Sequence, residues 1–156
     1  MKYIIDSCSL IVLKDTYRES VFPHAWVNVE NYIKEKKIWS CYEVYEDIKK
    51  QEGDSVFALI KEHTDIFIPP TKEIQLKVRE LLSEYPNLIR FKNKSSGSDP
   101  FVIATAIIHK VPVVTEEKKT GDINNPHIPD VCQALNHPCV KLVDLFEREG
   151  FKFVNR

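Results

Sequence analysis

Glycine is scarce in this sequence, and its cysteines lack the spacing of redox or zinc motifs. Only 4 of the 156 residues are glycine, which argues against a glycine-rich loop that cradles nucleotide phosphates. The four cysteines, Cys8, Cys41, Cys132 and Cys139, form no C-x-x-C pair, so we expect small buried side chains in a reducing compartment. His137 lies near two of them in the sequence, but the spacing matches no usual structural zinc site.

Long apolar runs and an excess of one charge are also absent. No stretch approaches the ~20 apolar residues that a membrane-spanning helix needs. The N-terminal apolar run is interrupted by Asp6, which leaves it too short for a signal peptide. We therefore expect a cytoplasmic protein with no membrane partner. The 22 basic and 23 acidic residues give a formal net charge of -1, which argues against a polycation that coats nucleic acid but leaves room for a local basic patch.

Short apolar segments alternate with segments whose apolar residues recur at helical spacing. Runs typical of strands, most of them buried and parallel, occupy residues 3–5, 38–40, 66–68, 111–115, 140–142 and 151–154. Helical patterns lie between them, with long examples at 22–36, 71–82 and 98–108. This alternation predicts a three-layer α/β/α sandwich with a mainly parallel central sheet. The length fits one domain over residues 1–156.

Polar side chains mark where several of these helices begin. Ser40 and Glu43 have the spacing of a capping box. Thr71 precedes a long amphipathic pattern, and Ser98 precedes a helix with a proline in its first turn. We expect these three hydroxyl side chains to cap their helices.

Carboxylates follow the predicted strands or begin the helices next to them. They are Asp6, Glu43, Glu46, Asp47, Asp99, Glu116 and Glu117. Since the carboxyl ends of parallel strands meet at one edge of a sheet, several of these groups are expected in one pocket. Gathered carboxylates repel one another unless a cation is present, and hard oxygen ligands suit Mg²⁺ or Mn²⁺. Such a site can activate water and hold a phosphodiester.

For some of these acids the sequence leaves open whether they lie at the site or have another role. Glu43 is explained by the capping box alone. Glu46 and Asp47 are neighbours on one helix and face different directions, so only one is expected at the site. Glu116 and Glu117 are also adjacent, and along an extended chain only one can point inward.

Several segments together resemble PIN-domain proteins. The segments are YIIDSCSLI at 3–11, FPHAW at 22–26, SCYEVYEDI at 40–48, GSDPFVIATAIIHK at 97–110, VPVVTEE at 111–117 and IPDVCQALNHPCVKLVDLF at 128–146. The closer resemblance is to a PIN-like family of small prokaryotic proteins that is catalogued as a domain of unknown function and grouped with VapC-type toxins. The resemblance spans nearly the whole chain in order.

This resemblance implies a ribonuclease that depends on Mg²⁺ or Mn²⁺. Asp6 matches the first-strand acid of PIN domains, Asp99 the acid that begins a helix, and Glu117 the acid after the next strand, beside the hydroxyl of Thr115. Asp47 matches the remaining acid, with Glu46 as its close rival. The chain departs from the family pattern in having Asp rather than Glu at position 47 and Glu rather than Asp at position 117.

The resemblance also implies partners. They are an RNA substrate, an antitoxin protein that would cover the acidic pocket, and a second copy of the chain in a homodimer. Four lysines flank the predicted pocket, and they either contact the RNA backbone or form a solvated loop: Lys92, Lys94, Lys118 and Lys119. The alternative function is a catalytically degenerate PIN-like domain that binds RNA or protein. A phosphatase is disfavoured because Cys8 stands where a second acid is usual, and a receiver domain is disfavoured because no acidic pair lies near the first strand.

Overall fold

A parallel β-sheet forms the centre of the protein. The computed structural model describes residues 1–51, 53–89 and 97–153. Its strands are β1 (Tyr3–Ile5), β2 (Ile38–Cys41), β3 (Phe67–Ile68), β4 (Val113–Val114) and β5 (Cys139–Val140). The described part forms a five-stranded sheet with the order β3-β2-β1-β4-β5, and every pair of neighbours is parallel. The predicted parallel sheet is therefore confirmed.

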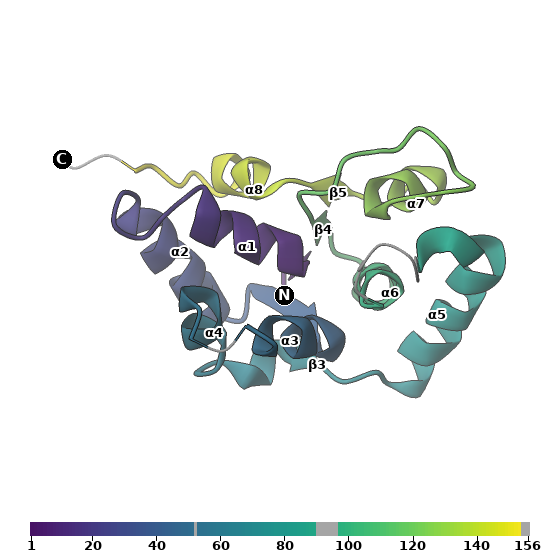
Figure 1. Cartoon of the computed structure of the whole chain (residues 1–156), viewed down its shortest axis with the longest axis horizontal. Coiled ribbons are helices and arrows are strands. Elements are labelled where there is room, and N and C mark those ends of the chain that lie inside the picture. The colour runs from purple at the N-terminus through teal and green to yellow at the C-terminus, as the bar shows by residue number, and fades with distance from the viewer. Residues whose placement is uncertain (52, 90–96, 154–156) are drawn as a thin grey trace.

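Helices cover both faces of this sheet, as Figure 1 shows. The α-helices of the described residues are α1 (Ser7–Asp15), α2 (Pro23–Lys34), α3 (Tyr42–Lys49), α4 (Ser55–Ile60), α5 (Lys72–Glu84), α6 (Asp99–His109), α7 (Ile128–Ala134) and α8 (Leu142–Arg148). Helix α6 contacts α5 and α7 in one layer, whereas α1 contacts α3, α4 and α8 in the other. The predicted three-layer α/β/α architecture is confirmed. None of these helices has both the length and the apolar character needed to cross a bilayer.

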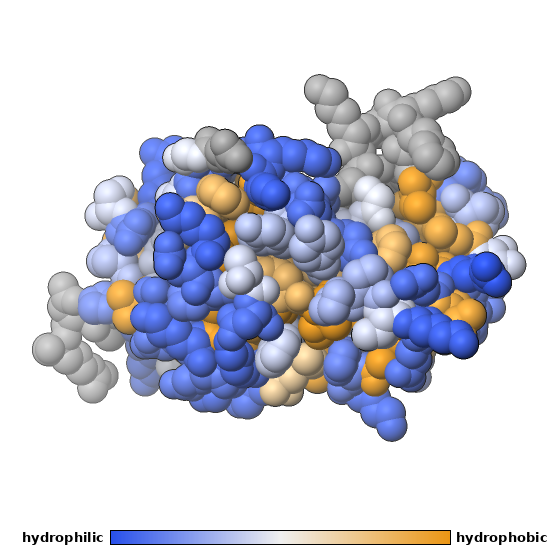
Figure 2. All heavy atoms as spheres, turned by 90° about the horizontal axis from the view of Figure 1, so that it is seen from below, coloured by the Kyte–Doolittle hydropathy of each residue, from blue (hydrophilic) through white to orange (hydrophobic). Residues whose placement is uncertain are grey.

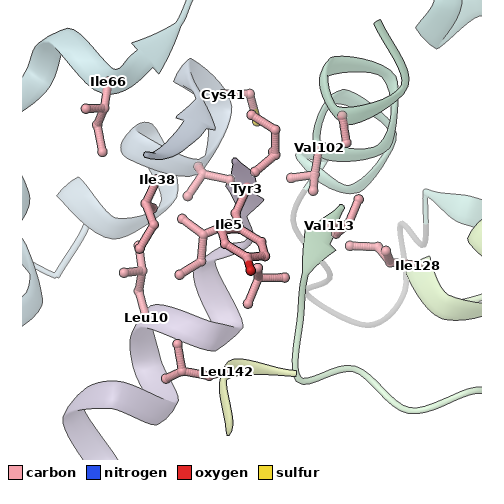
Figure 3. Close-up of a cluster of buried hydrophobic side chains, with 14 of the residues drawn as sticks. Tyr3, Ile5, Leu10, Ile38, Cys41, Ile66, Val102, Val113, Ile128 and Leu142 are labelled. Carbon is pink, nitrogen blue, oxygen red and sulfur yellow. The ribbon is translucent and has the colours of Figure 1, made fainter. Parts of the chain in front are cut away.

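The core lies between the sheet and the two helical layers. All three residues of β1 are buried, which is why the strand reads as a short continuous apolar run. Figure 3 shows Val102 of α6 and Ile128 of α7 near Val113 of β4, and Leu10 of α1 and Leu142 of α8 below the other strands. Apolar side chains from both helical layers thus fix how the helices lie on the sheet.

In the part of the chain that the structure describes, the large apolar side chains that are exposed come from different segments. Large apolar residues that are exposed are Met1, Val21, Val27, Tyr42, Leu76, Ile123 and Val143. They come from separate elements, and Figure 2 shows one face on which polar side chains predominate. Single exposed apolar residues are normal for a folded protein and require no partner to explain them.

The structure corrects several details of the prediction. Ser40 caps no helix: it lies buried in β2, where its Oγ donates to the Ile5 carbonyl oxygen at 2.5 Å, and Cys41 is the N-cap of α3. Ser98 precedes α6 but makes no side-chain capping bond. Thr71 does cap α5, since its Oγ1 accepts from Ile74 N at 3.2 Å.

Two predicted strands near the C-terminus also differ. The run at 140–142 is divided, because β5 ends at Val140 and α8 begins at Leu142. Residues 151–153 form no strand, and position 154 lies outside the described residues. Phe151 and Phe153 instead pack as single aromatic side chains against Phe146, with ring centroids 5.7 Å and 5.2 Å away. The aromatic residues of this segment are therefore held by ring packing and not by strand pairing.

Candidate metal centre

Three carboxylates from distant parts of the chain meet at the carboxyl edge of the sheet. Asp6 follows β1, Glu117 follows β4, and Asp99 is the first residue of α6. One carboxylate oxygen from each lies within 4.8 Å of the others. Asp6 is 2% exposed and Asp99 is 6% exposed, and Glu117 is half-buried. The parallel pairing of Ile5 with Val114 explains why Asp6 and the segment after β4 lie side by side.

Asp6 is held by donors on three sides. Its Oδ1 accepts from Ser7 N at 2.7 Å, and its Oδ2 accepts from Cys8 Sγ at 2.9 Å and Thr115 Oγ1 at 3.1 Å. Burial raises the pKa of Asp6, and these hydrogen bonds oppose that effect. The carboxyl group is thus oriented by neutral donors, none of which carries a positive charge, and a bound cation would supply one.

The two adjacent glutamates after β4 point to different partners. Glu117 Oε2 accepts from Ile128 N at 2.9 Å, at the start of α7, and Glu117 N donates to Thr115 Oγ1 at 3.2 Å. Glu116 Oε1 instead accepts from Leu142 N at 2.7 Å, at the start of α8. The structure therefore selects Glu117 as the acid beside Asp6 and gives Glu116 a helix-capping role.

The acids of α3 divide in a similar way. Asp47 lines the same cleft as the three carboxylates, with Lys50 Nζ 3.5 Å from its Oδ1, and its buried Oδ2 has no hydrogen-bond partner among the described residues. Glu46 is not among the residues that line the cleft, and its carboxylate raises the pKa of the exposed Tyr42 hydroxyl. Glu43 Oε2 is also buried without a described hydrogen-bond partner, and burial raises the pKa of Glu43. The geometry favours Asp47 over Glu46.

The cleft between these acids has a volume of about 750 Å³. Besides the four acids Asp6, Asp47, Asp99 and Glu117, it is lined by polar and apolar side chains of α1, α3 and α4 and the segment between the last two, including Ser7, Ile11, Ile48, Lys50, Gln51, Asp54 and Val56. The cleft is therefore large enough to admit part of a substrate as well as an ion, and its most buried lining residues include Asp6 and Asp99.

The donors suit a hard divalent cation. Carboxylate oxygens are the ligands that Mg²⁺ and Mn²⁺ prefer, and in the same cleft the buried Asp47 Oδ2 is an acceptor without a donor among the described residues. The four acids therefore fit such an ion. Cys132, His137 and Cys139 do not form a potential metal-ligand group among the described residues. The acidic triad is the one potential metal group found in the described ranges.

Sequence reasoning missed the part that Cys8 takes at this site. Its Sγ lies 3.1 Å from Thr115 Oγ1 and accepts from Glu116 N at 3.2 Å, in addition to donating to Asp6. Its position two residues after Asp6, on the first turn of α1, was the available signal. Of the predicted flanking lysines, Lys118 and Lys119 are exposed, whereas Lys92 and Lys94 lie outside the described residues.

The part of the sequence that matches a known protein family includes all of these acids. No curated protein matches the chain. A family model with the description "Domain of unknown function (DUF4411)" matches residues 3–153, a range that contains every acid of the candidate metal centre. The description names no activity, so the resemblance to PIN domains stays a prediction. Because the match covers almost the whole sequence, the chain belongs to the DUF4411 family.

Proposed function

We propose that the protein is a metal-dependent ribonuclease that hydrolyses phosphodiester bonds of RNA with Mg²⁺ or Mn²⁺. The observation that carries this proposal is the convergence of Asp6, Asp99 and Glu117, whose ligand oxygens lie within 4.8 Å of one another at the floor of an open cleft. A fold gains nothing from bringing three carboxylates together unless a cation or a proton offsets their repulsion. The choice of RNA among phosphodiesters rests on the resemblance to PIN domains.

The residues divide into ligands and groups that orient them. Asp6, Asp99 and Glu117 would hold the cation, and Asp47, which lines the same cleft, would contact a second ion or orient water. A divalent cation at this position lowers the pKa of water and neutralises charge on a phosphoryl group. Thr115 donates to Asp6 Oδ2 while accepting from Glu117 N, so one hydroxyl fixes the relative position of two ligands.

A cleavage assay tests this proposal directly. The variants Asp6→Asn and Asp99→Asn remove the two buried charges but keep the shape of each side chain. We expect RNA cleavage with Mn²⁺ to fall by at least about 100-fold in each, since even outer-shell partners of metal ligands are worth about 10- to 100-fold. Asp15→Asn is the matched control, because Asp15 ends α1 with its side chain 64% exposed. Metal-dependent cleavage that survives both substitutions would contradict the site assignment.

A binding role is the second candidate, and one observation favours it. Asp47 lines the cleft but does not belong to the group of three whose oxygens lie within 4.8 Å, and its side chain is shorter than the Glu of the PIN pattern. If the protein binds Mn²⁺ through Asp6 and Asp99 and binds RNA without cutting it, the domain is a binding module. Calorimetric titration with Mn²⁺ beside the cleavage assay separates the two candidates.

We further propose, on the same resemblance, that the protein acts in the cytoplasm as the toxin of a toxin–antitoxin pair and forms a homodimer. A segment of the antitoxin would lie across the acidic cleft. Expression without the antitoxin should arrest growth, and Asp6→Asn should relieve the arrest. Unimpaired growth at a verified level of folded protein would argue against the toxin role without affecting the cleavage test.

A further inference from the structure

A second cleft opens directly beside the acidic one. It has a volume of about 360 Å³, and Glu117, Lys118, Lys119, Cys139, Lys141 and Asp144 are among the residues that line it. Glu117 lines both clefts. The two hollows therefore meet at one ligand of the candidate metal centre.

Three lysines reach this second cleft from neighbouring strands. Lys118 and Lys119 follow Glu117 after β4, and Lys141 follows β5. Since Val114 pairs with Val140 in parallel register, these strand ends lie side by side at the carboxyl edge of the sheet. All three lysines are exposed. Sheet topology thus brings Lys141 beside Lys118 and Lys119, from which it is more than twenty residues away in the sequence.

The negative groups of this cleft are already engaged by backbone donors. Asp144 Oδ2 accepts from Lys141 N at 2.9 Å, and Glu117 Oε2 accepts from Ile128 N at 2.9 Å. No ion pair with a described residue involves the ammonium groups of the three lysines, whereas Lys50 at the acidic cleft pairs with Asp47. The three ammonium groups thus face solvent with their charges available to an anion.

We propose that this lysine cleft binds the phosphate backbone of single-stranded RNA beside the bond held at the metal centre. The inference rests on the proposed function and adds the path of the substrate: the strand passes Glu117 from the acidic cleft into the lysine cleft. An acidic cleft alone repels a polyanion, so a neighbouring cationic surface is needed to hold the strand when the near-neutral chain offers no general attraction. The flexible Lys head groups accept phosphates without reading base sequence.

Salt dependence of RNA binding tests this path. The variant with Lys118→Gln, Lys119→Gln and Lys141→Gln keeps three long side chains and removes three charges. Binding of a fluorescein-labelled single-stranded RNA to the full chain is measured by anisotropy in EDTA, where no cation-dependent cleavage occurs. Each phosphate contact contributes about 0.7 to the slope of log K against log salt for single strands, so the slope should become less steep by about 2.

A matched variant changes three lysines at the opposite edge of the sheet. Lys2 precedes β1, Lys34 ends α2 before β2, and Lys152 follows α8; all three are exposed. Their substitution by Gln should leave the slope unchanged. An unchanged slope in the lysine-cleft variant, or an equal loss in the control variant, overturns the inference.

Mn²⁺ titration and cleavage distinguish this failure from failure of the proposed function. The lysine-cleft variant should bind Mn²⁺ as the parent does, because Lys118, Lys119 and Lys141 are not ligands. If the parent cleaves RNA but the salt slope does not respond to these lysines, only the path is wrong. If the parent binds no RNA while Mn²⁺ binding persists, the path is also overturned, but the metal centre stands.

Discussion

We predict that Asp130 stabilises the conformation of the loop beside the candidate metal centre. It is 8% exposed, and its carboxylate accepts from Thr120 N at 2.9 Å, Thr120 Oγ1 at 3.1 Å, Gly121 N at 3.1 Å and His127 N at 2.9 Å. Burial tends to raise the pKa of Asp130, but these donors together lower it. One carboxylate therefore ties both ends of the loop that connects Glu117 to α7.

The loss of folding stability on removing this carboxylate depends on the donors that are then left without an acceptor. Net contributions of hydrogen bonds to charged acceptors are about 1.5–3 kcal/mol each, and about 0.5–1.5 kcal/mol when both partners are neutral. Thr120 and Gly121 are exposed, so water replaces part of what they lose. We expect Asp130→Ala to lower the free energy of unfolding by about 3–4 kcal/mol and Asp130→Asn by about half as much.

Thermal and urea unfolding measure this effect. For a domain of this size about 1 kcal/mol corresponds to about 2–4 °C in Tm, so Asp130→Ala should melt about 6–16 °C below the parent. The control is Asp122→Ala in the same loop, where an exposed carboxylate accepts from Asn124 N at 2.9 Å and Asn125 Nδ2 at 3.0 Å. Its cost should stay below about 1 kcal/mol, since water reaches all of its partners.

The loop also links Asp130 to the metal centre. Glu117 directly precedes the loop, and Ile128, whose N–H donates to Glu117, directly follows it. Asp130→Asn should therefore weaken Mn²⁺ binding by about 10-fold, the range found for outer-shell partners of ligands. Equal effects of Asp130→Ala and Asp122→Ala on stability would refute the reasoning about the loop. Unchanged Mn²⁺ affinity in a destabilised Asp130→Asn protein would refute the link to Glu117.

Three further predictions concern α3, the C-terminal helix and β2. Asp47→Asn should weaken Mn²⁺ binding in calorimetry by about 10-fold or more while Glu46→Gln leaves it unchanged; the reverse order would assign the site to Glu46. Glu149 accepts from two tyrosine hydroxyls and Lys2, and although burial opposes them, these bonds lower its pKa. Its contribution is thus present above its unfolded pKa of about 4.3 and is lost as the pH falls through the lower folded value. Urea unfolding should show the stability gap between the parent and Glu149→Gln closing below about pH 4, and a gap that does not change with pH would exclude this cause. Ser40→Ala should cost about 1 kcal/mol in urea unfolding by leaving a buried carbonyl without its hydroxyl donor, and a neutral result would show that this bond contributes nothing.

Much of the fold was predictable because the central strands β1, β2 and β4 are largely buried on both faces. Burial of this kind requires uninterrupted apolar residues, so the run at 3–5 and the acid that ends it are visible in the sequence. The strands at 38–41 and 113–114 were found in the same way, with boundaries that shifted by one or two residues. The helices between them followed from their apolar period, and parallel alternation then required both faces of the sheet to be covered.

The direction of individual side chains was not predictable. Ser40 and Glu43 fit a capping box by spacing alone, but parallel pairing extends β2 by one residue and turns the Ser40 hydroxyl toward Ile5. Glu116 and Glu117 are chemically almost identical, and only the positions of α7 and α8 separate them, because each helix start offers its own backbone N–H.

By itself, the sequence determined the order of strands and helices and the presence of an acid at the end of β1, after β4 and at the start of α6, because local apolar patterns set these features. The tertiary structure alone decided that Asp6, Asp99 and Glu117 share a site, that Asp47 rather than Glu46 faces it, and that lysines after two different strands gather beside it. These are contacts between segments far apart in the chain. Their distances depend on strand order and helix packing, which no local pattern encodes.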